Sequence, residues 1–173
     1  RGKVMMRITE SFDPNAVEWR KVTDPTETDF LIDFEYSLLG YDYESGRLDM
    51  LLRFKGNNGH CRRHRHIAST VTLILEGEQH VREVQPDGSS TSVVRKKGDY
   101  ALAGGDAMPH LERGGPKGCT LMLSMVTADG RLFEYFDRDM ESIRILTIEQ
   151  YVKSWERGIV PGALEIASSA SAA

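Results

Sequence analysis

Cysteine is scarce in this sequence, which has only Cys61 and Cys119 among its 173 residues. Two cysteines cannot build the dense disulfide framework that stabilises small secreted domains. No secretory signal is recognised either, so we expect both residues to be reduced thiols in a cytoplasmic protein. A chain of this length can bury a sizeable core without disulfides, and it fits one domain better than two.

Long hydrophobic runs and surplus positive charge are absent as well. No apolar stretch approaches the roughly 20 residues of a membrane-spanning helix. Lysine and arginine total 22 against 26 aspartate and glutamate residues, which gives a formal charge of -4. Because binding to phosphates requires surplus cations, a mildly acidic chain is a poor general binder of nucleic acid. We therefore expect neither a membrane nor a nucleic acid as partner.

Short apolar, β-branched segments fill the middle of the chain and are separated by turn residues. Pro86-Asp87-Gly88 and Asp129-Gly130 are typical turn sequences, and Glu76-Gly77 is expected to end a strand. Many short strands at regular spacing indicate an all-β sandwich or barrel. The main expected strands are 30–36, 47–55, 70–75, 79–85, 91–95, 119–126 and 132–136.

Helical signals are confined to the C-terminal part. Thr147 and Gln150 have the spacing of a capping box, so a helix is expected from there to about Arg157. Gly158 is a natural stop. We divide the chain into an N-terminal segment (1–29), a barrel (30–136), a C-terminal extension with the helix (137–162) and a disordered tail (163–173).

Three histidines have the arrangement of metal ligands. His64 and His66 are two residues apart, so a strand would place both rings on one face. His110 follows a glycine-rich turn and would come from a neighbouring strand. Neutral imidazole binds Fe, Zn, Ni, Cu or Mn, so the ligand type does not choose the metal. The competing interpretation is that these residues belong to a basic surface loop, because three arginines lie within residues 62–66.

The segment around the first pair resembles a known motif. Gly59 is followed by four residues, His64 and His66, three residues, Thr70, six residues and Gly77. This spacing resembles the first motif of the cupin superfamily. The segment from Gly98 to Gly114 resembles the second, with His110 one residue later than usual. The resemblance implies a cupin barrel (a double-stranded β-helix, or jelly roll) with a short C-terminal helix.

The departure at Thr70 changes the implied metal site. Many cupins have a glutamate ligand at this position, and a hydroxyl is a poor substitute for a carboxylate. The resemblance therefore implies a site of three neutral histidines, which would favour an anionic chelating substrate. A carboxylate from another part of the chain could still complete the metal shell, and the nearby acidic residues in the sequence are Glu76, Glu78 and Glu112. Glu76 and Glu78 flank a predicted turn, so we expect them outside the barrel.

Cupins with three histidines and no carboxylate include dioxygenases that cleave carbon–carbon bonds in β-diketones and in hydroxyacetophenone-type ketones. This chain resembles them in length, in its Arg-His-Arg-His core and in its C-terminal helix. The resemblance implies a dioxygenase that uses Fe²⁺, with Zn²⁺, Ni²⁺ or Mn²⁺ as alternatives, and that acts on a small carbonyl substrate with O₂. Two other functions stay open: a metal-containing module that binds or senses a ligand, and an oxygen-independent lyase or isomerase.

Further residues are candidates for the substrate pocket. Thr72 shares a face with Thr70, and Arg82 shares one with His80. Since a slip of one residue reverses the face, the sequence leaves open whether His80 and Arg82 line the cavity. An arginine there would orient an anionic substrate. We assign catalytic roles to Arg82, Thr72 and Tyr100, the last as an acid or base near the metal.

Other residues are expected to serve structure. Residues 95–97 should form solvated surface, and Cys61 lacks the identified base that a nucleophilic cysteine requires. Edge strands of such barrels often pair between subunits, so we expect a homodimer or homotetramer. Tyr100 is also a candidate for the hydrophobic core. The residues expected in the core are Phe54, Tyr100, Leu102, Met108, Leu121 and Leu123.

Overall fold

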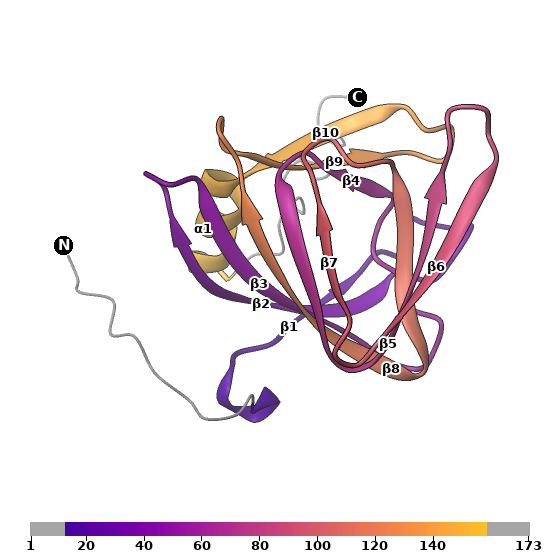
Figure 1. The fold of residues 1–173 in the computed structure, drawn as a ribbon, viewed down its shortest axis with the longest axis horizontal. Coiled ribbons are helices and arrows are strands. Elements are labelled where there is room, and N and C mark those ends of the chain that lie inside the picture. Colours follow the sequence, from indigo (N-terminus) through magenta and orange to yellow (C-terminus); the bar gives the residue numbers. More distant parts are fainter. Residues whose placement is uncertain (1–12, 159–173) are drawn as a thin grey trace.

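The computed structural model describes residues 13–158, so the tail expected at 163–173 lies outside the described residues. A ten-stranded sheet curls into an open barrel beside one helix (Figure 1), which confirms the all-β prediction. The elements are η1 (Pro14–Ala16), β1 (Arg20–Thr23), β2 (Asp33–Asp42), β3 (Arg47–Phe54), β4 (His64–His66), β5 (Ser69–Val84), β6 (Ser90–Lys96), β7 (Tyr100–Ala103), β8 (His110–Val126), β9 (Arg131–Phe136), β10 (Ser142–Thr147) and α1 (Ile148–Glu156).

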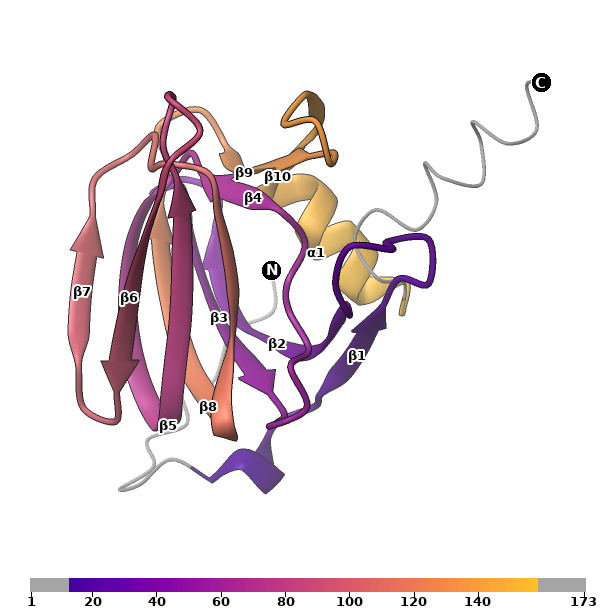
Figure 2. The same cartoon turned by 90° about the vertical axis from the view of Figure 1, so that its right-hand side faces the viewer.

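The sheet is organised around the long strands β5 and β8. The strand order is β1-β2-β3-β8-β4-β9-β10, and β5 pairs with β6, β7 and β8. Figures 1 and 2 both show β4, β9 and β10 together at the top, across the ends of the long strands. This crossing brings β4 against the beginning of β8, where His64 lies opposite His110.

Strand β5 continues where the sequence predicts that it ends. The pairing with β8 shifts register between Ile74 and Glu76 and again between Gly77 and Gln79, so the strand bends and goes on to Val84. Gly77 has a φ of +69°, a conformation that glycine adopts readily. The predicted end at Glu76-Gly77 is therefore wrong, because the turn-like residues form a bulge within one strand.

This bulge decides which side chains of β5 face the barrel interior. Thr70, Thr72 and Ile74 are buried before the bulge, and Gln79 and Val81 are buried after it. Their neighbours on the opposite face are more exposed. The alternation that the sequence left open is thus settled: His80 and Arg82 belong to the outer face of β5.

The hydrophobic core fills the space between β3, β8, β9 and α1. Phe54, Leu121 and Leu123 are buried as expected. Tyr100 and Leu102 are 63% and 64% exposed, so their assignment to the core is wrong. Among the described residues, strand β7 pairs with β5 alone, and three of its four residues are exposed.

The C-terminal helix begins as the sequence predicts. Thr147 is the N-cap, its hydroxyl accepts from the backbone N–H of Gln150, and the Gln150 side chain returns the capping-box bond. The helix buries Tyr151 and Val152, and the Trp155 ring contacts another aromatic ring on β2. Within residues 13–158, no helix is long and apolar enough to cross a membrane.

The bulge at Gly77 gives a test of the fold. An added Cβ at Gly77 would lie 2.1 Å from the Gly118 carbonyl oxygen, whereas at Gly88, which also has positive φ, it would meet nothing within 4 Å. We expect Gly88→Ala to lower the free energy of unfolding by about 1–2 kcal/mol through backbone strain alone. Gly77→Ala should cost about 1–3 kcal/mol more because of crowding. Urea unfolding measures both, and equal losses would contradict the crowding.

Candidate metal centre

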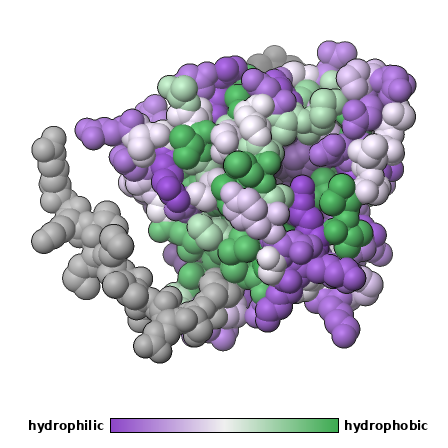
Figure 3. All heavy atoms as spheres, in the orientation of Figure 1, coloured by the Kyte–Doolittle hydropathy of each residue, from purple (hydrophilic) through white to green (hydrophobic). Residues whose placement is uncertain are grey.

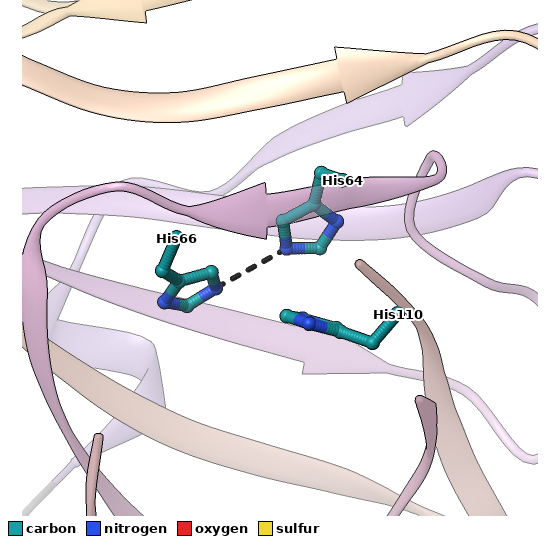
Figure 4. Close-up of side chains that lie close together, drawn as sticks. All are labelled: His64, His66 and His110. Carbon is teal, nitrogen blue, oxygen red and sulfur yellow. Dashed lines mark hydrogen bonds between the residues drawn. The ribbon is translucent and has the colours of Figure 1, made fainter. Parts of the chain in front are cut away.

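The three candidate histidines come from two strands that meet inside the barrel. His64 and His66 lie on β4, where alternation turns both rings to the inner side (Figure 4). Arg65 between them points away and forms ion pairs with Glu134 and Asp106. His110 begins β8 and is the cross-strand neighbour of His64. The register of β4 against β8 therefore produces the cluster that the sequence predicts.

The three rings are close enough to share one ion. The ring centroids of His64 and His110 lie 4.4 Å apart, and those of His66 lie 5.2 Å from each of the other two. One nitrogen atom from each ring lies within 4.8 Å of the other two. The two Nε2 atoms of His64 and His66 are 3.2 Å apart (Figure 4).

Backbone carbonyls fix the tautomers of two of these histidines. The Nδ1 atom of His64 lies 2.7 Å from the Arg62 carbonyl oxygen, and that of His110 lies 3.1 Å from the Met108 carbonyl oxygen. A carbonyl oxygen only accepts hydrogen bonds, so each Nδ1 carries the proton. Each Nε2 then has a free lone pair, which is the form that binds a metal ion.

Thr70 fixes the tautomer of the third histidine. Its hydroxyl donates to the Ala68 carbonyl oxygen at 3.0 Å and lies 2.9 Å from Nδ1 of His66. Because the hydroxyl proton is already used, the oxygen accepts from the Nδ1–H of His66. Thr70 therefore orients a ligand instead of being one, at the position where the resemblance would put a glutamate.

This donor set fits a divalent metal ion. Two lone pairs that face each other at 3.2 Å repel unless a cation lies between them, and metal–nitrogen bonds of about 2.1 Å at a right angle separate the nitrogens by about 3.0 Å. Burial, with the nearby His110, lowers the pKa of His64 to about 4. The same causes hold the pKa of His66 well below its usual range. Both rings are therefore neutral at pH 7, as ligation requires.

One carboxylate lies beside this set. Glu112 is buried on β8, two residues after His110 and on the same face. Its Oε1 atom lies 3.8 Å from Nε2 of His64. Among the described residues, the atoms that all lie within 4.8 Å of one another come from the three histidines, and Glu112 is not in this group. The structure thus places this carboxylate next to the ligand atoms rather than among them.

Several solved structures are similar in fold to this chain. An acetylacetone dioxygenase from Acinetobacter johnsonii is similar with a TM-score of 0.61 and 13% identity, over 91% of this chain and 96% of that one. A candidate acetylacetone dioxygenase from Methylibium petroleiphilum PM1 also has a TM-score of 0.61, with 17% identity over 88% and 99% of the two chains. An RmlC-like cupin protein from Ralstonia eutropha has a TM-score of 0.55, with 17% identity over 91% and 94%.

The chain has the cupin fold. At this level of identity the likeness shows the fold alone. No protein-family model matches the sequence, and a comparison with curated proteins finds no match.

A small cavity lies inside the cupin barrel and is lined by one of the three histidines, His64. Its volume is about 50 Å³, which corresponds to roughly three to five water-sized sites. Its polar lining consists of His64, Glu112 and Arg62 with Tyr36, Tyr135 and Tyr151, the last of them from α1. The remaining wall is largely apolar and includes Val22, Phe34, Met50, Leu52, Leu123 and Phe133. Such a cavity can hold a small organic molecule and keep bulk water away from it.

A second, open hollow is lined by another histidine of the cluster, His110. His110 and Arg82 line it together with Arg63 and Arg138. Arg63 and Arg138 form ion pairs with Asp29, whereas Arg82 has no ion pair with another described residue. The hollow is therefore electropositive and reaches a candidate ligand, which suits the approach of an anion.

The remaining predicted site residues are dispersed. Thr72 is buried on the inner face beside Thr70, as expected. Arg82 is exposed on the outer hollow, and Tyr100 lies on β7 and is exposed. The structure brings neither of the last two into the three-histidine cluster, and the catalytic roles of Arg82, Thr72 and Tyr100 stay predictions.

Sequence reasoning missed the polar chain behind Glu112. Gln79 is buried and donates to Oε2 of Glu112 at 2.6 Å, and Arg95 donates to Gln79 at 3.0 Å. The expectation that residues 95–97 are solvated surface is thus wrong for Arg95. Period two from His110 predicts the inward face for Glu112. No local sequence signal predicts that Gln79 faces inward, because its orientation depends on the bulge at Gly77.

The cysteines and outer carboxylates agree with expectation. Cys61 and Cys119 are free and buried. Burial and the charge of Glu112 raise the pKa of the Cys61 thiol well above its usual value, so this thiol is protonated and poorly nucleophilic. Glu78 bonds to His80 outside the barrel.

The role of Thr70 can be tested by two substitutions. Thr70→Val removes the acceptor of the His66 Nδ1–H bond, and we expect metal affinity to fall about 10- to 100-fold. Thr70→Ser keeps a hydroxyl and should retain affinity within a few-fold. Competition against a chromophoric chelator measures both. If the valine variant binds metal as tightly as the serine variant, Thr70 does not orient His66.

Proposed function

We propose that this cupin is an iron-dependent dioxygenase that cleaves a carbon–carbon bond in a small β-diketone or hydroxyketone. The observation that carries the proposal is the set of three clustered imidazoles without a carboxylate among the ligand atoms, next to a small, largely apolar cavity. Two proteins with a similar fold are named as acetylacetone dioxygenases, one of them as a candidate. That similarity supports the proposal without deciding the substrate.

The residues of the chain would perform distinct tasks in this reaction. His64, His66 and His110 would hold the ion, and three protein ligands leave positions for small molecules in a six-coordinate shell. Bound there, Fe²⁺ supplies Lewis acidity toward carbonyl oxygens and the redox chemistry that oxygen activation requires. The acceptors on the Nδ1 atoms keep the rings from turning, so the site is formed before a ligand arrives.

The cavity wall would control the chemistry around the substrate. Phe133 packs edge-on against the rings of His64 and His66, and with the other apolar side chains it excludes bulk water. Both atoms of O₂ would enter the two product fragments, so the reaction requires no external reductant. A substrate must be small, because a cavity of about 50 Å³ is well below the usual size of pockets for drug-like ligands.

Oxygen uptake tests this function directly. Protein loaded with Fe²⁺ under nitrogen is mixed with acetylacetone or a small hydroxyketone, and oxygen is then admitted. We expect one O₂ consumed for each substrate molecule lost. His66→Ala should abolish the uptake, and His80→Ala, which changes a histidine on the outer face, should leave it intact. No uptake with any member of a diketone and hydroxyketone panel would contradict the proposal.

A second candidate function is supported by Glu112. A lyase or isomerase that uses the metal as a Lewis acid usually needs a proton acceptor near the metal. The buried carboxylate beside His64 fits that description. Substrate conversion by the Zn²⁺-loaded protein under nitrogen would favour this candidate, whereas strict dependence on oxygen would exclude it.

Association of subunits is a further part of the proposal. Exposed apolar side chains on β6 and β7 include Val93, Val94 and Leu102. Figure 3 shows hydrophobic residues on the face where β7 lies in Figure 1. We propose that this face helps to form a homodimer or homotetramer. Sedimentation velocity should give a species larger than one chain, and a monomer at micromolar concentration would contradict it.

A further inference from the structure

One buried polar atom next to the candidate metal centre has no hydrogen-bond partner. Glu112 is 2% exposed, and its Oε1 atom has no hydrogen-bond partner of normal geometry among the described residues. Buried carboxylate oxygens are nearly always paired, because an unpaired one has lost its water without compensation. An unpaired oxygen on the wall of a cavity therefore points to a ligand that supplies the missing donor.

The other oxygen of Glu112 is firmly held. The Gln79 amide donates to Oε2 at 2.6 Å, and the Arg95 guanidinium donates to the Gln79 carbonyl oxygen at 3.0 Å. The positive charge of Arg95 thus polarises the amide that compensates the buried carboxylate. Because Oε2 is fixed in this way, the carboxylate cannot turn to exchange its two oxygens without breaking the bond.

The Oε1 atom of Glu112 lies beside the place that a metal-bound molecule would occupy. Oε1 is 3.8 Å from Nε2 of His64, and Glu112 and His64 line the same cavity. The Cys61 thiol also lines this cavity and is a hydrogen-bonding neighbour of the carboxylate. A thiol is a weak donor, and it forms no bond of normal geometry to Oε1. A ligand atom next to His64 would therefore be adjacent to an unoccupied acceptor.

An acceptor at this place distinguishes the two proposed substrate classes. A β-diketone chelates as an enolate, which has two oxygen acceptors and no donor to offer to Oε1. A hydroxyketone carries an O–H donor one atom from its carbonyl carbon. We propose that Glu112 accepts a hydrogen bond from a hydroxyl group of the substrate and so makes this cupin specific for hydroxyketones. The inference rests on the proposed function, since it requires a substrate held at the metal.

Ligand binding to the Co²⁺-loaded protein tests this specificity without turnover. Hydroxyacetone, methoxyacetone and acetylacetone are titrated, and the visible spectrum of the cobalt centre reports Kd. Hydrogen bonds to charged groups are strong enough that we expect hydroxyacetone to bind roughly 10- to 100-fold more tightly than methoxyacetone. Glu112→Gln would turn its amide N–H₂ toward the cavity, because Gln79 still requires an acceptor, and the preference should disappear. Glu78→Gln, the same change at an acid outside the barrel, should keep it.

Each outcome decides the inference. A wild-type protein that binds methoxyacetone or acetylacetone as tightly as hydroxyacetone overturns it, and this comparison requires no variant. A preference that survives in Glu112→Gln also overturns it, as does a loss of cobalt from that variant, which would make Glu112 a ligand. A preference abolished with cobalt content and thermal stability unchanged supports it. Absence of oxygen uptake by the iron-loaded protein would refute the dioxygenase proposal and leave this binding result standing.

Discussion

Three imidazole lone pairs that face one another inside the barrel are the constraint on which the rest of this structure depends. Each Nδ1–H is bonded to an acceptor, two of them backbone carbonyls and the third the Thr70 hydroxyl. The Nε2 atoms of His64 and His66 are consequently left 3.2 Å apart with no proton between them. Neutral rings in this arrangement repel one another, and a shared cation converts the repulsion into binding. The substrate class and the use of the cavity matter only if this site takes a metal.

The register in which the strands pair determines which side chains face the three histidines. Strand β4 has only three residues, yet its pairing with both β8 and β9 fixes which of its side chains face inward. The bulge in β5 changes the inner face from Thr70 before it to Gln79 after it. One inward residue orients a ligand and the other holds Glu112. A carboxylate near the site is therefore provided from β8, although the usual glutamate position is occupied by threonine.

The local part of this description could be predicted from the sequence, and the non-local part could not. Period two and the two glycine-flanked motifs predicted that His64, His66 and His110 converge, and the capping box predicted the start of α1. These signals lie within a few neighbouring residues. The inward position of Gln79, the reach of Arg95 and the exposure of Tyr100 depend on pairing between strands distant in sequence. A change of register by one residue reverses an entire face, so alternation alone was insufficient beyond the irregular pairing around Gly77.

X-ray absorption spectroscopy of the zinc-loaded protein tests the central claim most directly. The account predicts a first shell of nitrogen and oxygen atoms at about 2.0–2.1 Å, with the multiple-scattering pattern of three imidazole rings and no sulfur at about 2.3 Å. A shell with fewer than three imidazoles, or with a thiolate from Cys61, would show that the three histidines do not hold the ion together. That result would contradict the proposed centre and the chemistry inferred from it.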